Sequence, residues 1–237
     1  MSLQYYLPPE QIHDNAFFAE GRAVRHIAGA MRLRAGDEIT VFNGAGRAWR
    51  AVITTVRGGE VSGELKEELQ PPRQSTHITL CFAPVSRQAV ERIFDECAQL
   101  GCAAFRPVIT QRTQFDLRAG WEKKLPRWRE ILISACEQSG AAVVPEILEP
   151  LPFETAVRQA GPALIAAPGA ELNIAAAFAR LKTSKISLFV GPEGGFTPEE
   201  LRLAASAGVM SAKLGAYILR AETACAAACA ACAGVAA

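Results

Sequence analysis

The sequence predicts an α/β protein with two parts, a small β-rich domain at residues 1–70 and a larger α/β domain at residues 74–237. In the first part, short strand-like runs alternate with glycine-containing turns, which is typical of a small β-barrel. In the second part, apolar runs alternate with helical patterns, which favours a largely parallel sheet covered by helices. Between them, Pro71 and Pro72 indicate a linker, because proline fits poorly in helices and central strands.

The first part contains a predicted hairpin and a cluster of arginines. Strands are expected at residues 37–42 and 48–56, joined by a turn at Asn43-Gly44. Seven arginines lie between residues 22 and 57 against two acidic residues, whereas the whole chain carries a net charge of +1. Arginine binds phosphate with two parallel hydrogen bonds, so we interpret this cluster as an RNA-docking surface, the alternative being a solvated rim. The candidate RNA contacts are Arg22, Arg25, Arg32 and Arg34.

In the second part, expected strands and helices alternate along the chain. Apolar runs at residues 78–82, 105–109, 163–167 and 185–190 predict buried strands. Helical patterns span residues 90–100, 121–138 and 174–181, and Gly101 suits the position just after a helix. Ligands of such sheets bind beyond the carboxyl ends of the strands, so the loops at that edge are the expected functional sites.

The segment Gly191-Pro-Glu-Gly-Gly195 follows one of these strands and precedes a helix. Thr197 suits the N-cap of that helix, Pro198 its first position, and Glu200 completes a capping box. Glycines let a ligand approach the backbone closely and permit positive φ. The segment is neither a P-loop nor a dinucleotide fingerprint, since both spacings are absent.

Three cysteines near the end of the chain, Cys225, Cys229 and Cys232, have the C-x3-C-x2-C spacing of cluster-binding radical enzymes. The alanine-rich surroundings favour a helix instead, which would place the three thiols on one face. In a helix, the first and last would be roughly 10.5 Å apart along the axis, too far to converge on one cluster. We therefore predict core packing and no metal.

The composition indicates a soluble protein of the cytoplasm. No apolar run reaches the length of a membrane span, and the N-terminus lacks the pattern of a signal peptide. Seven cysteines, an odd number, favour free thiols in a reducing compartment.

Two motifs together resemble a known family. The sequence GPEGGF at residues 191–196 and the sequence LGAYILRAETA at residues 214–224 resemble SPOUT-class methyltransferases of the RsmE type, which methylate N3 of a uridine in 16S ribosomal RNA. The resemblance covers the whole chain and includes the run Arg32-Leu-Arg-Ala-Gly-Asp37 and the run Glu137-Gln-Ser139. The positions that differ from the usual family pattern are Glu96, Gln99, Ala141 and Tyr217.

The resemblance implies a PUA-like β-barrel followed by a SPOUT α/β domain whose C-terminal segment forms a trefoil knot. It also implies a homodimer that acts on ribosomal RNA, with S-adenosylmethionine bound against three loops. The implied cofactor-binding residues are Leu164, Ala166, Gly191, Glu193, Gly194, Gly195, Leu214, Gly215, Ile218 and Leu219.

The chemistry of N3 methylation suggests the catalytic residues. Uracil N3 loses a proton, and a cation near the carbonyl oxygens would stabilise the resulting anion. We take Arg220 as that cation, with Glu222 as a second catalytic candidate, and expect Arg112 to contact RNA phosphate. An ion pair between Arg220 and Glu222 is the structural alternative, and no general base is identified. Two other functions stay open: a non-catalytic ribosome-assembly factor, and a methyltransferase for ribose 2′-OH or transfer RNA.

Overall fold

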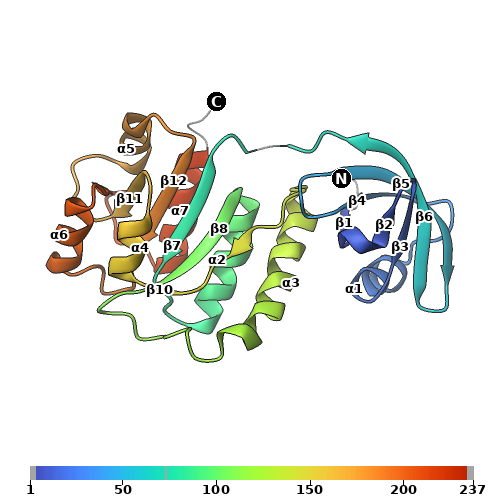
Figure 1. The fold of residues 1–237 in the computed structure, drawn as a ribbon, viewed down its shortest axis with the longest axis horizontal. Helices are drawn as coiled ribbons and strands as arrows, with labels where there is room; N and C mark the ends of the chain where they lie inside the picture. Colours follow the sequence, from blue (N-terminus) through green and yellow to red (C-terminus); the bar gives the residue numbers. More distant parts are fainter. Residues whose placement is uncertain (1–3, 73, 234–237) are drawn as a thin grey trace. The chain divides into compact units, whose positions relative to one another are not determined.

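The computed structural model describes residues 4–72 and 74–233 and divides into two compact units (Figure 1). The N-terminal unit comprises Met1–Arg73 together with Ile133–Val144, and the C-terminal unit comprises Gln74–Leu132 together with Pro145–Ala237. The last turns of a long helix and the loop after it therefore belong with the N-terminal unit. The boundary expected from the sequence, at residue 70, does not include this second segment of the N-terminal unit.

The N-terminal unit is built on a six-stranded sheet with the order β1-β4-β5-β6-β3-β2. The predicted hairpin is confirmed, because β4 and β5 pair antiparallel on either side of Asn43-Gly44. Among the described residues the sheet has two ends, β1 and β2, so the expected barrel is a curled sheet. The strands are β1 (Gln4–Tyr6), β2 (Ile12–His13), β3 (Ala16–Ala19), β4 (Glu38–Phe42), β5 (Ala48–Arg57) and β6 (Glu60–Leu69), with short helical segments η1 (Pro9–Gln11), α1 (Arg22–Val24) and η2 (Arg25–Ala30).

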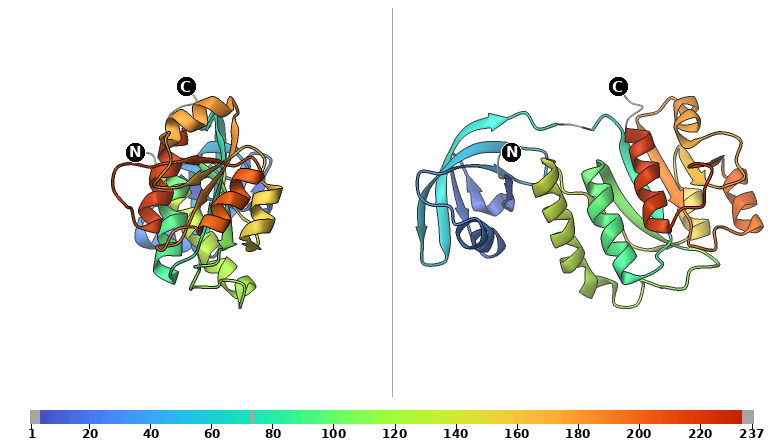
Figure 2. Two further views of the ribbon diagram at one scale, coloured as in Figure 1. Left: turned by 90° about the vertical axis from the view of Figure 1, so that its left-hand side faces the viewer. Right: turned by 180° about the vertical axis from the view of Figure 1, so that it is seen from behind.

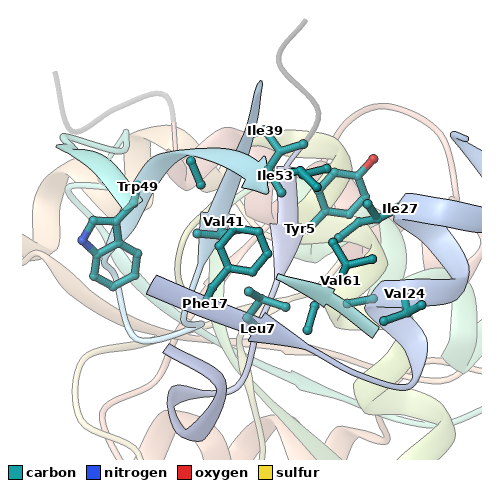
Figure 3. Close-up of a cluster of buried hydrophobic side chains, with 13 residues drawn as sticks. Tyr5, Leu7, Phe17, Val24, Ile27, Ile39, Val41, Trp49, Ile53 and Val61 are labelled. Atoms are coloured by element: carbon teal, nitrogen blue, oxygen red, sulfur yellow. The ribbon is translucent and has the colours of Figure 1, made fainter. Parts of the chain in front are cut away.

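The curled sheet encloses its own hydrophobic core (Figure 3). Phe17 and Val41 come from strands that are not neighbours in the sheet, Ile27 comes from η2, and all three are fully buried. Gly63 on β6 lets the strands approach closely, because a β-carbon there would lie 2.3 Å from the Val52 oxygen and 2.4 Å from the Phe17 ring. Burial of these side chains supplies the main driving force for folding of this unit.

The C-terminal unit contains a seven-stranded sheet in which every pairing is parallel, as the sequence predicts. Its order is β10-β8-β7-β12-β11-β13, with β9 paired to β8. The strands are β7 (His77–Phe82), β8 (Cys102–Ile109), β9 (Glu146–Ile147), β10 (Leu151–Pro152), β11 (Ala163–Ala166), β12 (Lys185–Val190) and β13 (Met210–Ala212).

Helices cover both faces of this sheet. On one face α2 packs against β8 and against α7, and α7 also contacts α5, β7 and β12 (Figure 2, right). On the other face, Phe153 and Ala156 of α4 and Ala204 of α6 join a core with Phe189 of β12. The helices are α2 (Arg87–Gln99), α3 (Trp121–Ser139), α4 (Phe153–Gln159), α5 (Ile174–Leu181), α6 (Pro198–Ser206) and α7 (Ala221–Ala233).

The C-terminal cysteines lie where the helical interpretation expects them. Cys225, Cys229 and Cys232 are fully buried in α7, and burial raises the pKa of the Cys232 thiol to about 12. The predicted core packing of these thiols is therefore confirmed, although the end of the expected helix, residues 234–237, lies outside the described residues. Among the described helices, none combines the length and apolar character of a membrane span.

Candidate functional site

Three loops leave the same edge of the C-terminal sheet at neighbouring strands. β12, β11 and β13 lie side by side and parallel, so their carboxyl ends at Val190, Ala166 and Ala212 meet at one edge. Just beyond it, Ala167 N donates to Ala212 O at 2.9 Å, which holds two of the loops together. Crevices at such edges are where ligands of open α/β sheets bind.

The glycine loop, residues 191–196, follows β12, and its glycines serve different purposes. Gly195 adopts φ +67 and closes a tight turn, with its N–H donating to Pro192 O at 2.8 Å. A β-carbon on Gly191 would lie 3.0 Å from the Phe196 ring, and one on Gly194 would lie 3.2 Å from Arg112 Cδ. Only Gly195 therefore uses the positive φ that glycine allows, whereas Gly191 and Gly194 make room for side chains.

Glu200 ties the glycine loop to the loop that follows β8. The predicted capping box is confirmed, with Thr197 N donating to Glu200 Oε2 at 2.8 Å and Glu200 N donating to Thr197 Oγ1 at 3.3 Å. The other carboxylate oxygen, Oε1, accepts from Gln111 N at 2.8 Å. The carboxylate thus bridges two loops that are distant in sequence, a role that a capping motif alone does not predict.

Arg112 lies beside the same bridge. Its Nη1 donates to the backbone oxygen of Gly194, so this arginine, expected to contact RNA phosphate, supports the glycine loop. Nothing in the local sequence indicates that contact, because it joins residues 82 positions apart.

One of the expected cofactor-binding residues, Leu164, lies away from the loops. Leu164 lies inside the sheet, paired with both β12 and β13, and is fully buried, so it packs in the core instead of lining a loop. Ile218 lies in residues 213–220, between β13 and α7, and its side chain is 86% exposed. Gly215 is open, with no atom within 4 Å of a β-carbon built there, and Leu214 and Leu219 are half-buried.

A cavity of about 350 Å³ lies beside the glycine loop. Its polar lining comes from the start of α2, from the glycine loop and from the start of α7, and comprises Ser86, Gln88, Arg92, Glu193, Arg220 and Glu222. The two catalytic candidates predicted from the sequence therefore line one cavity. Ser86, Gln88 and Arg92 were not identified from the sequence, because the start of α2 carries no recognisable motif.

The alternative of an ion pair between Arg220 and Glu222 is not supported. The carboxylate of Glu222 lies 3.6 Å from Arg92 Nη1, and its side chain is 12% exposed. Arg92 in turn donates to Glu96 Oε1 from Nη2 at 2.8 Å and from Nε at 3.1 Å. Arg220 is exposed and has no carboxylate within ion-pair distance in the part of the chain that the structure describes.

Two family models match the chain. A model described as an RNA methyltransferase domain matches residues 72–233, and a model described as an RNA methyltransferase PUA domain matches residues 19–66. This chain belongs to the RNA methyltransferase family. Curated relatives agree: Ribosomal RNA small subunit methyltransferase E of Synechocystis sp. is 33% identical over 94% of this chain and 75% of the relative, and that of Rickettsia conorii is 31% identical over 87% and 84%.

Solved structures share the fold over nearly the full length. The Ribosomal RNA small subunit methyltransferase E of Neisseria gonorrhoeae, bound to S-adenosyl methionine, superimposes with a TM-score of 0.88 at 32% identity, covering 98% of this chain and 96% of that chain. The Lpg2936 protein of Legionella pneumophila, in complex with the same cofactor, gives a TM-score of 0.85 at 28% identity, covering 97% of this chain and 96% of that chain. The two-part α/β fold predicted from the sequence is therefore confirmed as that of RNA methyltransferases.

The arginines of the N-terminal cluster in this RNA methyltransferase differ in whether they are paired with acidic residues. Arg22 donates from both terminal nitrogens to Glu137 at 2.7 Å, so its guanidinium is engaged in joining α1 to the end of α3. Arg47 and Arg50 pair with Glu68 and Glu67 of β6. These acids lie outside residues 22–57, the segment that contains the arginine cluster.

Three of the four candidate RNA contacts keep their side chains exposed. They are Arg25, Arg32 and Arg34, and within the described residues none of them forms an ion pair. Arg22 differs from these three, because a nearly buried carboxylate with 5% exposure accepts from both of its terminal nitrogens.

Proposed function

We propose that this chain transfers a methyl group from S-adenosylmethionine to N3 of a uridine in the 16S RNA of the small ribosomal subunit. The observation that carries the proposal is the meeting of the glycine loop with the loops after β11 and β13 at one sheet edge, beside a cavity that contains Arg220 and Glu222. The Synechocystis relative is described as a small-subunit ribosomal RNA methyltransferase, and so is the Neisseria gonorrhoeae structure, which shares the fold over 96% of its chain and is bound to this cofactor.

The loops fit a cofactor that is held through the backbone. Gly195 and Gly215 have no atom within 4 Å of a β-carbon position, so a ligand can lie directly against the main chain at both. We assign cofactor binding to Ala166, to Gly191–Gly195 including Glu193, and to residues 214–219. When bound, S-adenosylmethionine supplies a methyl group on a positively charged sulfur, which leaves as a neutral thioether.

Arg220 stabilises the anionic uracil in this proposal. It is exposed at the cavity, and its cation can face a carbonyl oxygen on which negative charge develops. Replacing Arg220 with Ala should lower the single-turnover rate by about 10²-fold, the scale of removing one preorganised donor. Arg220→Lys should keep part of the rate, and calorimetric affinity for S-adenosylmethionine should be unchanged in both variants. A normal rate for Arg220→Ala would end this assignment.

We further propose a trefoil knot and a homodimer. The path of the chain supports the knot, because β13 lies at the sheet edge beyond β11, whereas α7 packs against α2, β7 and β12. Tyr217 and Ile218 support the dimer, since each large apolar side chain is 86% exposed in the loop between β13 and α7. A sedimentation mass of one chain at micromolar concentration would contradict the dimer.

The substrate is tested by mapping the methyl group. Small subunits lacking the modification, incubated with labelled S-adenosylmethionine and the protein, should carry label at one uridine that then blocks reverse transcription, because an N3-methyl group occupies the pairing edge. Label on ribose or on transfer RNA would refute the base assignment. Absence of both label and calorimetric cofactor binding would favour the assembly-factor alternative.

A further inference from the structure

The cavity beside the glycine loop holds a carboxylate whose surroundings are unusual. Glu222 lies in the first turn of α7 with a side chain that is only 12% exposed, and its remaining surface lines the cavity. No donor within the described residues hydrogen-bonds this carboxylate; its nearest cation is Arg92 Nη1, at 3.6 Å. The carboxylate lines the cavity without a hydrogen-bond donor from the described residues, so a ligand N–H can donate to it.

Arg92 is held in place from its other side. Its Nε and Nη2 both donate to Glu96 Oε1, one helical turn further along α2, at 3.1 and 2.8 Å. Because Nε and Nη2 bind Glu96, Nη1 is the nitrogen that lies near Glu222. Glu96, Arg92 and Glu222 therefore form a row from α2 to α7. The row places the Arg92 guanidinium 3.6 Å from the Glu222 carboxylate.

The lining of the cavity complements the pairing edge of uracil. That edge presents one N–H donor, N3–H, between two carbonyl acceptors. The cavity offers one recessed carboxylate, Glu222, together with donors on Gln88 and Arg220. Its volume of about 350 Å³ lies at the lower end of the range for small-molecule sites and suits a single nucleoside.

We propose that the target uracil binds in this cavity, that Glu222 accepts the N3 proton, and that Arg92 is the residue that positions Glu222. This inference rests on the proposed function and adds the base that the reaction needs. The N3–H bond breaks as its proton passes to the carboxylate, and the N3 electron pair forms the bond to the methyl carbon. The carbon–sulfur bond breaks with its pair left on sulfur, and Glu222 returns the proton to water.

The test is a pH profile of single-turnover methylation on unmodified small subunits. Glu222→Gln should lower the rate near neutral pH by about 10²-fold or more, and its log rate should then rise with pH at a slope of about 1, because hydroxide must remove the proton. The wild-type profile should be flatter. The charged groups that face Glu222 are Arg92 and Glu96 from α2, Glu193 from the glycine loop, and Arg220.

Glu91→Gln is the matched control. Glu91 is also a partly buried carboxylate on α2, with 22% exposure and two arginine partners, Arg87 and Arg127, but it does not line the cavity. The control should keep the wild-type rate and slope. A flat profile and a normal rate for Glu222→Gln would overturn the inference while leaving the proposed function intact. A wild-type protein that methylates no small-subunit RNA would refute the proposed function itself.

The Arg92→Lys variant tests whether Arg92 positions the Glu222 carboxylate or only stabilises the fold. Lysine keeps the charge but cannot hold Glu96 and Glu222 in the same geometry, so kcat should fall several-fold and the pH slope should steepen. Calorimetric affinity for S-adenosylmethionine should stay at the wild-type value. A lower melting temperature with an unchanged pH profile would assign Arg92 a structural role only and overturn its positioning role.

Discussion

Replacing Glu200 should loosen the glycine loop more than any other single carboxylate change in α6. Its Oε2 accepts from Thr197 N and its Oε1 from Gln111 N, both at 2.8 Å, and the residue is 9% exposed. One carboxylate therefore holds the start of α6 and the loop after β8. We expect Glu200→Gln to weaken both attachments, because an amide has only one acceptor oxygen and its NH₂ group faces a backbone donor.

The size of the effect follows from these two bonds. A hydrogen bond to a charged group contributes about 1.5–3 kcal/mol, and the bond to Gln111 is only partly buried, so we expect Glu200→Gln to lower the free energy of unfolding by about 2 kcal/mol. Glu200→Ala, which removes both acceptors, should lower it by about 3 kcal/mol. With a urea m-value of about 2–3 kcal/mol/M, the alanine variant should unfold at a midpoint about 1 M lower.

Urea unfolding followed by tryptophan fluorescence measures this effect, since Trp121 and Trp128 are buried in the C-terminal unit. The matched control is Glu199→Gln, one position earlier, where the carboxylate is exposed and forms an ion pair with Arg202. That control should leave the midpoint nearly unchanged. Equal midpoints for Glu199→Gln and Glu200→Gln would refute the reasoning. Glu200→Gln should also weaken calorimetric binding of S-adenosylmethionine several-fold, because the loop it anchors is the proposed cofactor site.

Three further outcomes are expected. Gly195→Val should abolish calorimetric cofactor binding, since φ +67 is strained for a β-branched residue, and unchanged affinity in the folded variant would contradict this. Arg32→Ala combined with Arg34→Ala should weaken RNA binding and reduce its salt dependence while sparing cofactor binding; wild-type affinity at every salt concentration would argue for a solvated rim. Burial raises the pKa of Cys81 from 9.0 to about 12, so this thiol should resist labelling at pH 8. Because the folded pKa is the higher, its contribution to stability is complete below pH 9.0 and lost as pH rises towards 12; rapid labelling of native protein would contradict this.

The sequence by itself determined the elements whose signals are local. The expected helix at residues 174–181 and the expected strand at residues 185–190 match α5 and β12, and Gly101 lies after α2 with φ +81. The capping box of Thr197 and Glu200 could also be predicted from the sequence. Helix caps and hydrophobic periodicity both depend on residues within a few positions of one another. The family motifs likewise lie in short runs.

Only the tertiary structure decided which distant groups meet. Arg22 pairs with Glu137 across 115 positions, and Arg92 reaches Glu222 from another helix. Such partners are selected by strand order and helix packing, which local patterns do not specify. Leu164 shows the same limit: its buried strand was predicted, but its position inside the strand and away from the loop follows from its pairing with both β12 and β13. Sequence therefore determined which segments form the proposed site, and packing determined which of their side chains line the cavity.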